Sequence, residues 1–338
     1  MNQYKFKSIL SLRVFVFLYL STLMFSVTFG KDKIPPLPFV PGSFTIAVMP
    51  DTQYYRNKNV HHFANQTKWI ANNASKYNIA YVIHLGDITQ RNKPHEWVVA
   101  QKAMRNLDKA KVPYSLALGN HDYSWGKPLP QRRKSPLINE YFKVDDFKKW
   151  PTFGGAEDGK LNNSYHLFEA NGTKFIILSL EWSPMHKTIA WADKILAKYP
   201  ERKAILATHA YLYYDNTRYD RKKPGQKWNP FSYPMNKDKI NDGEMIWQKL
   251  VKKHNFILTF NGHVLGDGQG RLTSTGDNGN LVHQILVNYQ MLKEGGAGYM
   301  RLVEFLPDGN TIQFKSYSPS MDKYLTDSQN QFILKLKK

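Results

Sequence analysis

Side chains that can bind metal ions or transfer protons follow five predicted β-strands. They are Asp51, Asp87, Asn120 with His121, His209 and His263. A single polar residue after a strand commonly just caps a turn, so none of these positions is informative alone. In open α/β sheets, however, ligands bind at the carboxyl ends of the strands. Because all five strand ends carry such a side chain, we predict that they line one crevice.

The residue types at these positions are those of a mixed-ligand metal site. Asp51 and Asp87 offer carboxylate oxygens, Asn120 offers a neutral amide oxygen, and two histidines offer imidazole nitrogens. Oxygen ligands alone would suit Ca²⁺ or Mg²⁺, whereas added imidazole favours Zn²⁺, Mn²⁺ or Fe.

The order of the motifs resembles that of the calcineurin-like metallophosphoesterase family. The matching motifs are Asp51-x-x, Gly86-Asp87, Gly119-Asn120-His121-Asp122, an isolated His209 and Gly262-His263. The resemblance covers roughly residues 44 to 318. It implies a four-layer α/β/β/α sandwich of two mixed β-sheets, and two divalent metal ions (Mn, Zn, Fe or Mg).

The resemblance also implies a role for each matching residue. Asp87 would bridge the two ions, while Asn120, His209 and His263 would complete the second metal site. A water with a metal-lowered pKa would attack phosphorus.

His121 would donate a proton to the leaving-group oxygen or hold the phosphate, and Asp122 would orient the His121 ring through a hydrogen bond. The implied activity is hydrolysis of phosphate monoesters or diesters. Two alternatives stay open: a catalytically weak or inactive protein that binds phosphate or an acidic glycan, and a hydrolase of other esters such as sulfates.

Two histidines that the family uses at the first metal site are missing. Its first motif, Asp-x-His, is Asp51-Thr52-Gln53 here, and its Gly-His-x-His motif ends in Leu265. Gln53 could supply a weak amide ligand that favours a hard ion such as Mn²⁺ or Mg²⁺. His283 could fill the vacant position, or be an ordinary strand histidine. The protein could also bind one ion only. Our hypothesis is that two ions bind, the first one loosely.

The elements that must position these residues alternate between strand and helix. The first half is predicted as strand 44–50, helix 59–77, strand 79–85, helix 94–110 and strand 112–118. A hairpin over 164–180, helices over 188–199 and 242–254, and strands over 203–208, 256–260, 281–289, 298–305 and 311–317 follow. This order predicts an α/β fold with two mixed sheets packed face to face and helices outside.

Two long loops are candidates for the substrate-binding walls. Residues 211–234 interleave aromatic and cationic side chains, among them Tyr211, Arg218 and Trp228, and Arg132 lies in the facing segment. Such a mixture suits an anionic small molecule, a nucleotide, or a phosphorylated or acidic glycan. In the alternative interpretation, the aromatic side chains anchor the loop and the cations are solvated.

The beginning of the chain predicts export. Residues 1–30 combine three basic residues with an uncharged apolar run over 14–27, which is typical of a signal peptide; an uncleaved anchor is the alternative. We predict a linker over 31–42, a phosphoesterase domain over 43–320 and a C-terminal tail over 321–338. The protein would then be secreted or periplasmic, with no membrane span after cleavage.

The charge of the chain indicates which binding partners it favours. The chain has no cysteine and a net charge of +20, which becomes +17 once the three basic residues of the first thirty are removed. Such a charge favours anionic partners. No motif for sequence-specific nucleic-acid binding stands out.

Overall fold

The computed structural model describes residues 34–123, 137–233 and 239–337. The predicted signal peptide and Arg132 lie outside the described residues, so both stay predictions. No helix within the described ranges is long and apolar enough to cross a membrane.

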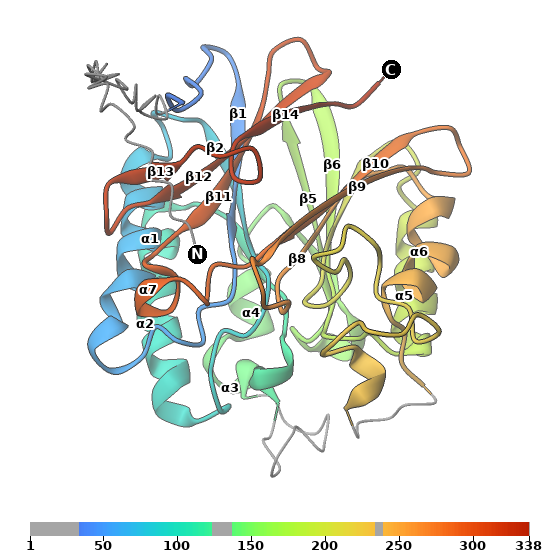
Figure 1. Cartoon of the computed structure of the whole chain (residues 1–338), viewed down its shortest axis with the longest axis horizontal. Coiled ribbons are helices and arrows are strands. Elements are labelled where there is room, and N and C mark those ends of the chain that lie inside the picture. The colour runs from blue at the N-terminus through green and yellow to red at the C-terminus, as the bar shows by residue number, and fades with distance from the viewer. Residues whose placement is uncertain (1–33, 124–136, 234–238, 338) are drawn as a thin grey trace, which may run out of the picture. The chain divides into compact units, whose positions relative to one another are not determined.

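Two mixed β-sheets form the centre of the fold (Figure 1). The first sheet has the order β13-β12-β11-β1-β2-β3, with β14 also paired to β12. Its strands are β1 (Phe44–Met49), β2 (Ile79–His84), β3 (Tyr114–Leu116), β11 (Met300–Phe305), β12 (Thr311–Ser318), β13 (Lys323–Leu325) and β14 (Phe332–Lys335). The neighbours β1, β2 and β3 are parallel, so their carboxyl ends share one edge.

The second sheet has the order β4-β5-β6-β7-β8-β10-β9. Its strands are β4 (Phe153–Ala156), β5 (Ser164–Ala170), β6 (Thr173–Ser179), β7 (Lys203–Ala207), β8 (Phe256–Asn261), β9 (Gln269–Thr275) and β10 (Leu281–Val287). Strands β6, β7, β8 and β10 are parallel neighbours. The predicted hairpin is β5–β6, turning at Asn171-Gly172.

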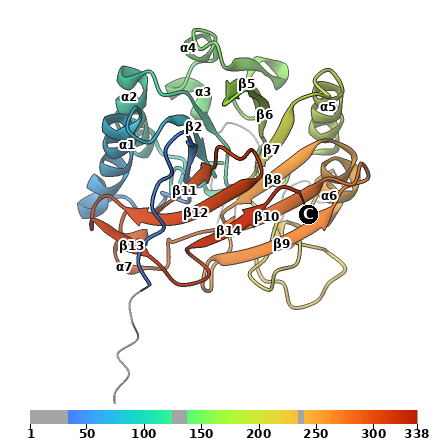
Figure 2. The same cartoon turned by 90° about the horizontal axis from the view of Figure 1, so that it is seen from above.

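Helices cover the outer faces of both sheets, which confirms the predicted fold class (Figures 1 and 2). The helices are α1 (His61–Asn73), α2 (Pro94–Ala110), α3 (Ile138–Tyr141), α4 (Val144–Phe147), α5 (His186–Ala197), α6 (Gly243–Lys249) and α7 (Lys293–Gly296). Helices α1 and α2 flank the first sheet, and α5 and α6 flank the second.

The parallel strands are buried on both faces, as their continuous apolar sequences predict. In β1, Ile46 and Val48 belong to a core cluster that also contains Ile205 of β7 and Phe260 of β8, so this cluster lies between the sheets. Alternate β1 residues such as Ala47 belong to the other cluster, which includes helix residues. The strand ends are therefore held by packing on both sides.

Several element boundaries differ from the predicted ones. Strand β3 is shorter than predicted, and α6 ends at Lys249 because a separate 3-10 turn over Val251–Lys253 follows it. Helix α2 has the predicted bounds, since Pro94 opens it and the Glu96 carboxylate accepts a hydrogen bond from the Lys93 N–H at 3.0 Å.

The segment predicted as a tail adds strands to the first sheet, and the segment predicted as a linker contacts it. Strands β13 and β14 both pair with β12, so the residues after 320 contribute strands. The Leu37 N–H donates to Gln331 Oε1 at 2.7 Å, and Gln331 Nε2 donates to the Pro35 carbonyl at 3.0 Å. Residues 35–37 therefore lie directly beside the start of β14.

Buried His166 of β5 predicts a pH dependence of stability. Burial lowers the pKa of His166 to about 3, whereas an exposed histidine has a pKa of about 6.5. The unfolded chain therefore binds a proton that the folded chain excludes, and this share of stability is lost as pH falls from 6.5 toward 3. We expect the free energy of unfolding to be about 2 kcal/mol smaller at pH 5 than at neutral pH. Urea unfolding of wild type and His166→Gln at pH 7 and pH 5 checks this, and equal pH dependence in both proteins would contradict it.

Candidate metal centre

The five strand ends deliver their side chains to one edge shared by the two sheets. Asp51 follows β1, Asp87 follows β2, and Asn120 lies in a 3-10 turn (Asn120–Asp122) after β3. His209 follows β7 and His263 follows β8, so the second sheet supplies the imidazoles. All five are buried, with at most 6% of each side chain exposed. The crevice predicted from the sequence thus receives side chains from both sheets.

Asp87, His209 and His263 form the most compact part of this centre. Their potential ligand atoms all lie within 4.8 Å of one another. His209 Nε2 lies 3.2 Å from Asp87 Oδ2, without the alignment of a hydrogen bond. Asp87 has a left-handed backbone conformation with a φ of 46°, which is rare for a residue with a side chain and typical of functional sites.

Backbone carbonyls orient both imidazole rings. A carbonyl oxygen only accepts, so His209 Nδ1–H donates to Leu85 at 2.9 Å and His263 Nε2–H donates to Trp228 at 2.9 Å. His209 Nε2 and His263 Nδ1 are then the atoms left for a cation. Burial lowers the pKa of His263 to about 3, which keeps this ring neutral.

Asp87 and His209 each shift the pKa of the other so that its charged form is favoured. Burial alone would lower the pKa of His209, but the nearby carboxylates of Asp87 and Asp51 raise it to about 9. Burial alone would raise the pKa of Asp87, but His209 and His121 hold it well below its usual value. A cation that bound here would replace the His209 proton, because a metal needs the imidazole lone pair.

Buried acceptor atoms without donors test whether these residues fit a metal. Gln53 Oε1, Asn120 Oδ1 and His209 Nε2 are buried and have no hydrogen-bond partner among the described residues. Burying an unpaired polar atom is costly, and native proteins largely avoid it. A cation satisfies oxygen and nitrogen acceptors that lack donors, so the residues fit divalent metal ions.

Asp51 is held by residues that the sequence analysis missed. It accepts hydrogen bonds from the His263 N–H at 3.1 Å and from Asn288 Nδ2 at 3.1 Å. Gln290 accepts from Gln53 Nε2, which leaves Gln53 Oε1 as the free amide atom. Burial, and to a lesser degree Asp87, raise the pKa of Asp51 to about 8. Asn288 and Gln290 follow the end of β10, so the rule that identified the other strand ends could have found them.

Two glycines leave room for the two carboxylates. A Cβ on Gly119 would lie 2.0 Å from Asp87 Oδ1, and a Cβ on Gly262 would lie 1.9 Å from Asp51 Oδ1. Contacts this short cannot form, so only glycine permits these carboxylate positions.

Gly262→Ala is predicted to weaken metal binding selectively. The new Cβ displaces the Asp51 carboxylate but approaches no backbone atom within 3 Å, so the chain should still fold. We expect the affinity of the weaker ion to fall by about tenfold or more, comparable with losing a ligand-supporting contact. Titration of metal-free protein with Mn²⁺ measures this. Unchanged binding of all ions would contradict the prediction.

His121 points toward the centre from its open side. Its side chain is 17% exposed, and its Nε2 lies 4.0 Å from Asp87 Oδ2. Its Nδ1–H donates to the Gln90 carbonyl at 2.8 Å, and its backbone N–H donates to Asp87 Oδ1 at 2.9 Å. The ring is therefore oriented with Nε2 toward Asp87.

The expected hydrogen bond between Asp122 and His121 is not the one that the structure forms. Asp122 accepts from the N–H groups of Gly119, Ile88 and Thr89 at 2.8–3.1 Å, and from the Thr89 hydroxyl at 2.9 Å. Burial raises the pKa of Asp122 to about 7. Asp122 thus joins the loops after β2 and β3, and the Gln90 carbonyl takes the orienting role.

The sequence model of the calcineurin-like phosphoesterase family matches residues 44–267. The chain belongs to the calcineurin-like phosphoesterase family. Residues 44–267 therefore correspond to a calcineurin-like phosphoesterase domain.

Known structures share the fold of this phosphoesterase. A purple acid phosphatase, PPD1 from yellow lupin (Lupinus luteus) seeds, has a TM-score of 0.53 and 15% identity over 89% of this chain and 55% of its own. A dimetal phosphatase from Danio rerio has a TM-score of 0.53 and 12% identity over 87% of this chain and 99% of its own.

A curated relative is similar in sequence. The uncharacterized protein YvnB of Bacillus subtilis (strain 168) is 33% identical over 319 residues. The match includes 90% of this chain. It spans only 22% of the length of that relative.

The predicted substrate residues of the 211–234 loop have structural roles in this phosphoesterase. Tyr211 is buried and donates to Gln284 at 3.2 Å, and Arg218 forms an ion pair with Glu244 at 2.6 Å. Trp228 contacts the centre through its carbonyl, which accepts from His263. Buried Tyr211 therefore anchors the loop, whereas Arg218 is paired and not solvated as the alternative interpretation expected.

His283 does not fill the vacant position of the first site. It lies within β10, where Nδ1 pairs with the Thr273 hydroxyl and Nε2 with the Lys335 carbonyl, both at 2.8 Å. It is an ordinary strand histidine.

A cavity of about 190 Å³ adjoins the Gln53 side of the phosphoesterase centre. Thr52, Gln53 and Gln90 line it together with the cationic side chains of Arg56, Arg91 and Lys93. The loops after β1 and β2 form this cavity together with residues of α1 and α2, and no substrate role was predicted for them from the sequence.

Proposed function

We propose that this phosphoesterase uses two divalent ions, of which the first is held more weakly. Asn120, His209 and His263 would hold the second ion, and Asp87 would bridge to the first. Asp51 and the amide oxygen of Gln53 would complete the first site. Because this first set contains oxygen only, it favours a hard ion such as Mn²⁺ or Mg²⁺. The second set, with two imidazoles, suits Zn²⁺, Fe or Mn²⁺.

The observation that carries this proposal is the orientation of the buried acceptors. Gln53 Oε1, Asn120 Oδ1 and His209 Nε2 have no donors among the described residues, and both histidines have their other nitrogen occupied by a carbonyl. The pairing of Gln53 Nε2 with Gln290 leaves Gln53 Oε1 as the amide atom without a partner, which supports its assignment as a ligand.

The residues of the chain would share the chemistry with the ions. When bound, divalent ions screen the negative charge of the phosphate and lower the pKa of the attacking water. His121 would donate a proton from Nε2 to the leaving-group oxygen when its ring carries both protons, because Nδ1–H is already engaged with the Gln90 carbonyl. Asp122 positions the loops that carry Asp87 and His121 by joining their backbones.

The cavity beside Gln53 supports a substrate with a second polar or anionic part. Arg56, Arg91 and Lys93 would attract this part while the reacting phosphate lies at the metal centre. A small phosphate ester, a nucleotide, or a phosphorylated or acidic glycan has this chemistry.

Metal reconstitution tests the proposed function. Protein purified without chelator should hold one tight ion, and added Mn²⁺ should increase hydrolysis of an aryl phosphate or an aryl phosphodiester. Gln53→His restores an imidazole to the first site, so we expect it to hold the weaker ion more tightly. An aryl sulfate serves as the control ester.

The opposite results identify the alternatives. One tight ion with no response to Mn²⁺ would contradict the two-ion proposal. If wild type and His121→Ala are equally inactive with every metal tested, the result would favour a protein that binds its ligand without hydrolysing it. Faster hydrolysis of the aryl sulfate than of the aryl phosphate would favour a sulfate ester hydrolase.

We also propose export to the periplasm or the exterior, from the basic and apolar sequence of residues 1–30. Cell fractionation with mass determination of the product tests this. Cytoplasmic protein that retains residues 1–30 would contradict it.

A further inference from the structure

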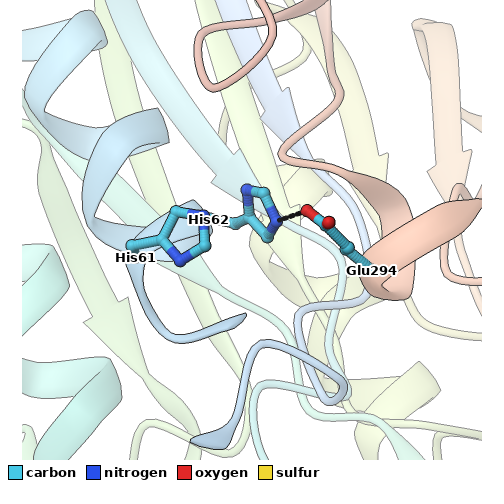
Figure 3. A group of neighbouring side chains, drawn as sticks. All are labelled: His61, His62 and Glu294. Carbon is cyan, nitrogen blue, oxygen red and sulfur yellow. Dashed lines mark hydrogen bonds and ion pairs between the residues drawn. The ribbon is translucent and has the colours of Figure 1, made fainter. Parts of the chain in front are cut away.

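A second group of potential metal ligands lies outside the phosphoesterase centre. It consists of His61 and His62, which open α1, and Glu294 from the turn after β10 (Figure 3). Their ligand atoms lie within 4.8 Å of one another. His62 Nε2 and Glu294 Oε2 are 3.0 Å apart. The group therefore brings together segments that are more than 200 residues apart in sequence.

The turn that presents Glu294 has an unusual backbone. Five successive residues, 294–298, have positive φ values of 58°, 73°, 116°, 48° and 76°. Glycine tolerates this conformation, but Glu294 and Ala297 adopt it against their steric preference. Such strain persists where the surroundings impose it, and it concentrates at ligand sites and functional segments.

His62 is prepared to act as a ligand. It is 1% exposed, and burial lowers its pKa, so the ring is neutral at neutral pH. Ser320 Oγ lies 2.8 Å from His62 Nδ1 and also accepts from Asn65 at 3.1 Å. These contacts hold the ring with Nε2 toward Glu294, as Figure 3 shows.

His61 completes the group from the exposed side. Its Nδ1–H donates to the Lys58 carbonyl at 2.9 Å, which leaves Nε2 with a free lone pair. Its ring centroid lies 4.0 Å from that of His62, and the two rings are neighbours in Figure 3. Since His61 is exposed, its side chain can adjust when an ion binds.

We infer that His61, His62 and Glu294 bind a transition-metal ion such as Zn²⁺, separate from the ions of the phosphoesterase centre. Two imidazoles with one carboxylate are an established ligand set for Zn²⁺, and a water completes four-coordination. The 3.0 Å separation of the nitrogen and oxygen suits two ligands of one ion with bonds of about 2.0–2.2 Å.

This ion would fasten two segments that reach the first catalytic metal position. A Cβ on Gly295 would lie 2.5 Å from Tyr54 Cβ, and one on Gly296 would lie 2.8 Å from the Tyr55 hydroxyl. These tyrosines follow Gln53, whose partner Gln290 precedes the same turn. The site would thus have a structural role, linking the turn to the beginning of α1.

Zn²⁺ titration of metal-free protein tests the inference. By isothermal calorimetry, wild type should bind one Zn²⁺ more than His61→Ala, and Glu294→Gln should bind this ion at least about tenfold more weakly. His61→Ala should fold normally because the side chain is exposed, and should keep its hydrolytic activity with Mn²⁺. His95→Ala, which removes an exposed histidine elsewhere, should bind Zn²⁺ like wild type.

A second background separates this site from the catalytic ions. His209→Ala should lose ions of the phosphoesterase centre and keep the Zn²⁺ that depends on His61. If His61→Ala and Glu294→Gln bind Zn²⁺ with the number and affinity of wild type, His62 and Glu294 form only a hydrogen bond and the inference is wrong. That result would leave the proposed catalytic site unaffected.

Discussion

Asp87→Asn is expected to lower kcat/KM by on the order of a thousandfold or more and to release both ions. Asp87 is the carboxylate at the middle of the centre, 3.2 Å from His209 Nε2 and 4.0 Å from His121 Nε2. An amide of the same shape carries no charge and presents a donor to one side. Elemental analysis and hydrolysis of an aryl phosphate with Mn²⁺ measure the two effects.

Asp122→Asn is the matched control for this substitution. Asp122 is equally buried, but its described partners are backbone N–H groups and the Thr89 hydroxyl. We expect it to lose about 1–3 kcal/mol of stability through a mispaired hydrogen bond and to retain its ions. If Asp87→Asn keeps both ions, or if Asp122→Asn loses them instead, the assignment of the bridging position is wrong.

His121→Ala is expected to lower kcat by roughly 10²- to 10⁴-fold while ion content stays unchanged. The lost group is the proton donor to the leaving oxygen. The ring is partly exposed and its printed hydrogen bond is to the Gln90 backbone, which the variant retains, so the fold should tolerate the change. Hydrolysis by wild type and variant, each loaded with the same metal, measures the effect.

A series of aryl phosphates then separates the two possible roles of His121. A leaving group of low pKa needs no proton, so the deficit of His121→Ala should shrink as the leaving-group pKa falls. A deficit that is the same for every leaving group would show that His121 holds the phosphate instead. His254→Ala removes a histidine that precedes β8 and pairs with Asp193, away from the centre, and as the control it should match wild type.

The strand ends were predictable because their signal is local. A buried parallel strand is a continuous apolar run, and the run stops where the polar residue begins, as at Met49 before Asp51. Helix α2 was equally clear, since Pro94 and Glu96 mark its beginning within the sequence itself. The resemblance to the family motifs then predicted which of these strand ends share a metal site.

The remaining features depend on partners far away in the sequence. Asn288 contacts Asp51 across 237 residues, and its place after β10 marks it as a candidate without indicating this partner. Asp122 is adjacent to His121, yet the N–H groups of Ile88 and Thr89, more than 30 residues earlier, determine its role. The polar strand β9 lies at the edge of its sheet, where the apolar pattern is weak.

The contacts between residues 35–37 and Gln331 bear on how this domain can be built into larger proteins. A domain whose first segment contacts the start of its last strand can be circularly permuted with a linker about as long as that strand, without crossing its own core. The exposed turn at Asn171-Gly172 offers a place for new ends, far in sequence from every residue of the metal centre. A permuted phosphoesterase opened there would keep each strand end, and with it the geometry on which hydrolysis depends.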